Sequence, residues 1–138
     1  VYFNLFIVAM MVLVSANNLD IRDLDGTQDS VQLYDCNFVE DNISTSVVSG
    51  TNYLMTKQIS PYRENSFFIR NKGASTLTVT LQVAPTDSND YYLDYSSDQS
   101  VTGGDNNLTS VTSVMKYARL KVVASTTVAV DVYYNARA

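Results

Sequence analysis

The stretch Thr76-Leu77-Thr78-Val79-Thr80-Leu81-Gln82-Val83 alternates polar and apolar side chains without a break. Successive side chains of a β-strand point to opposite faces of a sheet. This period of two therefore places the aliphatic residues on one face and the threonines with Gln82 on the other. A helix would need apolar residues three to four positions apart. The stretch predicts a half-buried strand of an antiparallel sheet.

The segment before this strand carries the same signal. Ser66–Asn71 places Phe67 and Ile69 on one face, and Asn71-Lys72-Gly73-Ala74 follows it as a turn sequence. Two alternating runs joined by a short turn that contains glycine are typical of a β-hairpin. We therefore expect Ser66–Asn71 to pair with Ser75–Ala84.

The rest of the chain after Ala16 also consists of short runs separated by polar turns, and no helical period occurs there. About eight strands spaced in this way predict an all-β domain over residues 17–138, an antiparallel β-sandwich or jelly roll. In the last strand, Thr127–Asn135, the alternation directs Val128, Val130, Val132 and Tyr134 inward. Other strands are expected within Val31–Val39, Tyr53–Ile59, Tyr91–Tyr95, Leu108–Met115 and Tyr117–Ala124, with loops at Ser44–Asn52 and Ser96–Asn107.

Composition excludes several classes of function. The net charge is −5, and the nine Lys and Arg residues form no stripe, so we expect no nucleic-acid partner. The chain has no histidine and one cysteine, which removes the commonest general base and the usual zinc and Cys–His arrangements. The acidic residues between Asp87 and Asp98 fit turn residues better than a catalytic carboxylate pair. We expect no enzymatic activity.

The segment Val1–Ala16 contains no charged residue. As a helix it would rise about 24 Å, short of the roughly 30 Å hydrocarbon core of a bilayer. An element that is apolar all round must be buried, and we expect other copies of the chain to bury this one, as a helix or as a donated strand. A signal peptide or an uncleaved membrane anchor is the alternative. The large side chains of this assembly arm, residues 1–16, are Val1, Tyr2, Phe3, Leu5, Phe6, Ile7, Val8, Met10, Met11, Val12, Leu13 and Val14.

Two groups of oxygen-bearing side chains on predicted turns make calcium the one candidate cofactor. Carboxylate and amide oxygens are the ligands that Ca²⁺ prefers, but neither group matches a complete calcium loop. The alternative is that these residues make ordinary turn hydrogen bonds. The first group is Asp23, Asp25 and Asp29, and the second is Asp87, Asn89 and Asp90.

Three further features are weaker signals. Cys36 is the single cysteine, so it can form a disulfide only with another chain; the alternative is a small semi-buried residue. Asn42 and Asn107 begin N-x-Ser/Thr sequons and are candidate glycosylation sites. The tyrosines of the Tyr91–Tyr95 segment could stack on a carbohydrate or serve as half-buried strand and contact residues.

Several motifs carry a family resemblance. They are Ile21–Asp25 with Asp29-Ser30-Val31, Ser66–Asn71 with Gly73, Ala84–Asp87, and Lys116–Leu120 with Asp131–Asn135. Together they resemble an uncharacterised β-sandwich domain family of spore-forming Gram-positive bacteria. This resemblance implies an extracellular or spore-surface setting and no activity. The general plan, a β-sandwich behind an N-terminal connector, is also similar to that of endospore-appendage and pilus-type subunits, although a cysteine-rich connector is missing.

These observations predict a structural subunit that self-assembles into a pilus-like extracellular filament through its apolar arm. Head-to-tail contact between identical chains is heterologous, and an open heterologous contact builds a helical fibre. The expected partners are therefore further copies of the chain, with membrane contact only during export. The alternative is a cell-surface carbohydrate-binding or membrane-anchored module.

Overall fold

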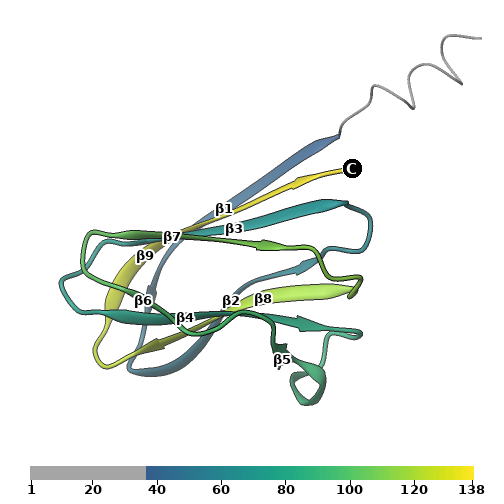
Figure 1. Ribbon diagram of the computed structural model, residues 1–138. Coiled ribbons are helices and arrows are strands. Elements are labelled where there is room, and N and C mark those ends of the chain that lie inside the picture. Colours follow the sequence, from purple (N-terminus) through teal and green to yellow (C-terminus); the bar gives the residue numbers. More distant parts are fainter. Residues whose placement is uncertain (1–36) are drawn as a thin grey trace, which may run out of the picture. The chain divides into compact units, whose positions relative to one another are not determined.

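A computed structural model describes residues 37–138, which fold into two antiparallel sheets packed face to face (Figure 1). This arrangement confirms the predicted all-β sandwich. One short 3-10 turn, η2 (Asn89–Tyr91), interrupts the strands. The strands are β1 (Phe38–Val47), β2 (Gly50–Gln58), β3 (Glu64–Asn71), β4 (Leu77–Ala84), β5 (Leu93–Asp94), β6 (Gln99–Val101), β7 (Asn106–Val111), β8 (Tyr117–Ala124) and β9 (Val128–Arg137).

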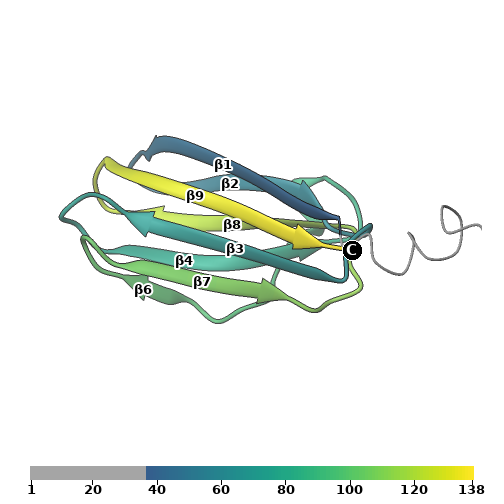
Figure 2. The ribbon, with the colours of Figure 1, turned by 90° about the horizontal axis from the view of Figure 1, so that it is seen from above.

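The chain passes repeatedly from one sheet to the other. The four-stranded sheet has the order β1-β9-β3-β7, and the five-stranded sheet has the order β2-β8-β4-β5, with β6 also paired to β4. Viewed from above, β9 lies between β1 and β3 along their whole length (Figure 2). The start of β1 therefore meets the end of β9, where Phe38 pairs with Arg137.

The core lies between the two sheets, where the period-two pattern places it. The aliphatic residues of β4 predicted to face inward are at most 1% exposed, and so are Phe67 and Ile69 on β3. Tyr134 of β9 packs its ring against Phe67 at a centroid distance of 5.1 Å. The inward face predicted for the last strand is confirmed, since Val128, Val130, Val132 and Tyr134 are all buried.

The predicted hairpin is wrong. β3 pairs with β9 and β7, whereas β4 pairs with β8, β5 and β6. The turn after Asn71 carries the chain across the sandwich, so that the apolar faces of both strands cover the same core from opposite sides. Alternation records which face of a strand is buried and not which strand lies beside it.

The loop predicted at Ser44–Asn52 is also wrong. β1 continues to Val47 and β2 begins at Gly50, so two residues make the connection. Gly50 has a φ of +104°, which a residue with a side chain rarely adopts. The side chain of Asn52 accepts a hydrogen bond from the Val48 N–H (3.1 Å) and donates one to the Val48 carbonyl (2.8 Å). Polar residues that suggested a loop thus close a tight turn.

The segment after β4 is more ordered than its composition predicts. Residues within Tyr91–Tyr95 form part of η2 and the short strand β5, and β6 lies inside the predicted loop Ser96–Asn107. These pieces cover the outer face of β4, where Thr80 and Gln82 are buried. Thr80 donates a hydrogen bond to Asp98, at 2.5 Å. β4 is therefore buried on both faces along part of its length.

Candidate functional site

Within residues 37–138, the four-stranded sheet ends at two strands, β1 and β7, neither of which has a bulge. β1 pairs with β9 over ten consecutive residues, and β7 pairs with β3 over six, both without a register shift. Neither strand contains proline or lysine. An edge strand leaves a row of N–H and C=O groups unpaired, and an unprotected edge can accept a further strand. Both edges are therefore candidate interaction surfaces.

The neighbouring edge strand β2, in the other sheet, is blocked. Its register shifts between Leu54 and Lys57, and Met55 within this bulge has a φ of 54°. Lys57 points toward the sandwich interior, where it lies over the Tyr134 ring and forms an ion pair with Asp41 of β1. Bulges and inward-pointing charges are the means by which proteins prevent pairing at an edge. Asp41 is the inward-pointing charge of β1, so the bulge is what distinguishes the edge of β2 from that of β1.

The two unblocked edges are complementary in direction. Each strand of the four-stranded sheet is antiparallel to its neighbour, so a second copy shifted sideways would place its β1 antiparallel to β7. Val39 near the start of β1 lies in one cross-strand row with Val111 at the end of β7, through Ala136 and Asn65. A contact between two different edges is heterologous, and its repetition gives an open row of subunits where the rotation between copies does not close a ring.

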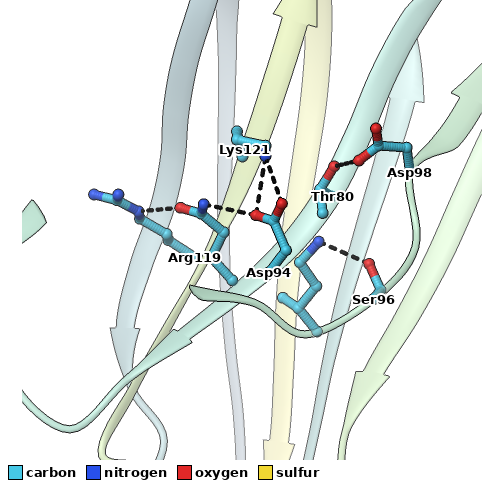
Figure 3. Close-up of polar contacts among 8 residues, drawn as sticks. Thr80, Asp94, Ser96, Asp98, Arg119 and Lys121 are labelled. Atoms are coloured by element: carbon cyan, nitrogen blue, oxygen red, sulfur yellow. Dashed lines mark hydrogen bonds and ion pairs between the residues drawn. The ribbon is translucent and has the colours of Figure 1, made fainter. Parts of the chain in front are cut away.

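Arg119 of β8 is the centre of a polar cluster on the outer face of the five-stranded sheet (Figure 3). Its side chain is buried, and the guanidinium carbon lies 3.7 Å from the ring centroids of both Tyr53 and Tyr92. The Nε–H donates to Gln82 (2.9 Å), and Nη1 donates to Asn89 (2.7 Å). Two aromatic rings and two amide oxygens together compensate the buried charge.

The cluster continues to the far edge of this sheet. Gln82 donates to Asp94 of β5 (2.8 Å), and the Lys121 ammonium lies 2.9 Å from both oxygens of the same carboxylate. Hydrogen bonds from Gln82 and Lys121 hold the pKa of Asp94 below its usual range. Burial, together with the hydrogen bond to Asp87, raises the pKa of Tyr92 to about 12. The Arg119 cluster thus joins β2, β8, β4 and β5 on the outer face of this sheet.

A cavity of about 250 Å³ opens at the end of the sandwich where β1 begins. It lies between the β2–β3 and β7–β8 loops, with Ile59 almost fully buried and Val114 fully exposed. We call it the end pocket. It is lined by Ile59, Ser60, Tyr62, Arg63, Thr112, Ser113, Val114 and Met115.

Two residues of the second calcium candidate set accept side-chain hydrogen bonds. Asp87 accepts from the Tyr92 hydroxyl (2.9 Å), and Asn89 accepts from Arg119. Asp90 is exposed on η2. Across residues 37–138, no three His, Cys, Asp or Glu side chains gather as a metal site. The first candidate set, Asp23, Asp25 and Asp29, lies outside these residues, and calcium binding stays a prediction.

The three tyrosines considered for carbohydrate stacking point to different surroundings. Tyr92 stacks on Arg119, Tyr91 is exposed on η2, and the Tyr95 hydroxyl lies 2.9 Å from that of Thr112. Of the two sequon asparagines, Asn42 is exposed on β1, and Asn107 is half-buried on β7. The assembly arm and Cys36 lie outside the described residues.

Sequence reasoning missed the Arg119 cluster and the end pocket. Arg119 stands at an alternating position of β8, where an arginine is ordinarily solvated. Its two stacking partners come from segments 66 and 27 residues away, and no local pattern joins them. The one feature of the sequence that could have indicated such stacking was its ten tyrosines in a chain without tryptophan.

The fold is a two-sheet, all-β sandwich. The chain belongs to the family described as Domain of unknown function (DUF6385), whose profile matches residues 58–138. The match begins at the last residue of β2 and covers β3 to β9. The resemblance to an uncharacterised β-sandwich family is thereby confirmed. No curated protein matches the sequence.

Solved structures share the fold at low sequence identity. The structure described as "Crystal structure of PirA" aligns with a TM-score of 0.54 and 12% identity, covering 68% of this chain and 92% of that chain. One described as "Bacillus endospore appendages form a novel family of disulfide-linked pili" aligns with a TM-score of 0.47 and 11% identity, covering 74% and 89%. The first of these similarities shows the sandwich fold alone. Residues 37–138 contain no helix of the length and apolarity needed to cross a bilayer.

Proposed function

We propose that this protein is a non-catalytic structural subunit that assembles with copies of itself into an extracellular filament or surface appendage. The observation that carries the proposal is the pair of unblocked edges, β1 and β7, at opposite sides of one sheet. Their directions allow β1 of one copy to pair with β7 of the next, so that the sheet continues from subunit to subunit. The blocked edge of β2 directs assembly to this sheet.

The apolar arm adds the second contact. Residues 17–36 connect it to β1, the edge strand that would meet a neighbouring copy. At about 25 cal/mol per Å² of apolar surface, burying its dozen large side chains would contribute on the order of 20 kcal/mol before the costs of association. Edge pairing sets the geometry of the polymer in this proposal, and the arm supplies most of the stabilising burial.

Electron microscopy of the purified chain, with edge-blocking variants, tests the proposal. Ile43 of β1 and Thr109 of β7 face the interior next to an open edge, so a lysine at either position would imitate Lys57 of β2. We expect Ile43→Lys and Thr109→Lys to give folded protein without filaments. Val123→Lys is the matched control, since Val123 is as exposed as Ile43 (38% and 41%) but lies on a central strand.

Deletion of residues 1–16 should likewise leave a folded, unassembled domain. Filaments that form from both lysine variants as readily as from the control would overturn edge pairing. Filaments that form without residues 1–16 would overturn the role of the arm. A full-length chain that stays monomeric at all concentrations would overturn the function itself, and a glycan array would then test the carbohydrate-binding alternative.

A further inference from the structure

We infer that the end pocket of each subunit receives an apolar side chain from the assembly arm, residues 1–16, of the neighbouring copy. This inference deepens the proposed function and rests on it. The pocket, at about 250 Å³, is smaller than the 300–1,000 Å³ typical of small-molecule sites. It is of a size for one or two large side chains, which is how protein interfaces seat their anchor residues.

The chemistry of the end pocket matches an uncharged apolar occupant. Ile59 and the half-buried Tyr62 and Met115 form its apolar lining, and Met115 and Tyr62 pack against the core. Val114 stands fully exposed at the rim. Hydroxyl groups and Arg63 complete the rim. An apolar centre within a polar border is the usual composition of a protein interface.

Internal hydrogen bonds hold the β2–β3 side of the pocket in shape. The buried Asn65 donates from Nδ2 to the carbonyls of Ile59 (3.5 Å) and Tyr62 (3.4 Å). Its Oδ1 accepts a hydrogen bond from the Tyr134 hydroxyl, at 2.7 Å. The N–H of Ile59 donates to the carbonyl of Lys116 (2.8 Å), which joins the two loops.

The β7–β8 side is also fastened. The Tyr95 hydroxyl lies 2.9 Å from the Thr112 hydroxyl and accepts a hydrogen bond from the Thr112 N–H, at 3.4 Å. Both loops are thus fixed before anything enters the pocket. A preformed site binds without the cost of ordering its own walls.

The geometry of the edge contact places the start of the neighbour's β1 nearer to the β7–β8 side of the pocket than the subunit's own β1. Within one subunit, Phe38 on β1 lies three strand positions from β7, or about 14 Å at roughly 4.8 Å per strand. In a β7–β1 contact between copies, the start of the incoming β1 lies one strand position, about 5 Å, from the end of β7. The chain leads from Val111 directly into the pocket wall at Thr112.

The connector between the arm and β1 is long enough for this path. Residues 17–36 can span up to about 70 Å when fully extended. In the edge contact the start of β1 lies beside the neighbour's end pocket, and a connector of this length allows the arm to reach that pocket. Insertion adds a second contact to each edge contact between copies. Two linked contacts bind with a higher overall affinity than either contact alone.

Disulfide trapping between two tagged chains tests the inference. In a Cys36→Ser background, one chain carries Val114→Cys at the pocket rim and the other carries Phe6→Cys in the arm. We expect a covalent product that contains both tags and requires both cysteines. Val48→Cys replaces Val114→Cys in the matched control, because Val48 is also an exposed valine (59%) but lies at the other end of the sandwich.

Three results would overturn the inference. They are no mixed product from filaments that form normally, equal trapping by Val48→Cys, or a product only within one chain when both cysteines are on the same molecule. The first result would leave the proposed function intact, since assembly would continue without pocket binding. Absence of filaments from the parent chain would instead count against the proposed function.

Discussion

Arg119 and Tyr53 stack with 3.7 Å between the guanidinium carbon and the ring centroid, and this contact crosses a break in the sheet. Tyr53 belongs to the regular part of β2, whereas Arg119 stands opposite the bulge between Leu54 and Lys57. The stack therefore fastens β2 where its ladder with β8 is interrupted. A bulge that blocks one edge is stabilised from the outer face of its own sheet.

Replacing Arg119 with methionine should destabilise the domain by about 2–4 kcal/mol. The substitution keeps much of the apolar stem but leaves the buried Gln82 and the Asn89 amide oxygen without their donor. Urea denaturation followed by circular dichroism measures the loss. Arg70→Met on the outer face of β3 is the control, and because Arg70 is exposed its effect should stay within about 0.5 kcal/mol. Equal losses for the two variants would contradict the clamp.

Tyr134→Phe should cost about 1–3 kcal/mol of unfolding free energy. The hydroxyl of Tyr134 donates to Asn65 in the buried interior, and its removal leaves a buried amide oxygen unpaired while the ring packing stays. Tyr133→Phe, at the adjacent exposed position, provides the comparison and should be nearly neutral. Denaturation midpoints of the two variants distinguish the buried hydrogen bond from a general effect of losing a hydroxyl.

Stability should fall in alkaline solution. Burial, with a smaller contribution from Tyr62, raises the pKa of Tyr134 to about 12. A group whose pKa is higher in the folded state contributes stability below its unfolded value, near 10, and loses it as the pH rises toward 12. For the buried Tyr134 the loss amounts to roughly 2–3 kcal/mol at about 1.4 kcal/mol per pKa unit. Unfolding free energies measured from pH 9 to 12 should decline less steeply in Tyr134→Phe, and an unchanged slope would refute this assignment.

Stability should also fall in acid through Asp94. Its pKa is lowered in the folded state by hydrogen bonds from Gln82 and Lys121. A lowered pKa contributes stability above the unfolded value, near 3.9, and the contribution disappears as the pH drops through the folded value. Asp94→Asn cannot titrate, so its unfolding free energy should depend less on pH below 4. The same acid slope in parent and variant would show that other carboxyl groups carry the effect.

The sequence allowed the inner faces of the strands to be predicted but not their partners. Alternation in β4 and β9 identified the buried residues because burial of a strand face depends on local pattern. The hairpin of β3 with β4 was wrong because pairing depends on which strand completes each sheet. In this fold β3 lies beside β9, which follows it by more than fifty residues. The local periodicity of a strand does not indicate which distant strand it pairs with.

Surfaces built from several strands were beyond prediction for the same reason. The end pocket combines residues near Ile59 with residues near Val114, and the Arg119 cluster combines four segments. Each residue alone fits an ordinary loop or solvated position. The apolar arm and the absence of histidine are properties of the sequence itself, so they could be recognised without a fold.

The central position of β9 determines when, during synthesis of the chain, the four-stranded sheet can form. β9 lies between β1 and β3, and Ser44 of β1 contacts Asp131 across 87 positions of sequence. Until β9 has been synthesised, the four-stranded sheet lacks the strand that joins β1 to β3. β1 has no pairing partner in this sheet before then. A growing chain cannot present the finished edge during translation. In the proposed polymer, edge pairing would therefore have to wait until synthesis of the chain is complete.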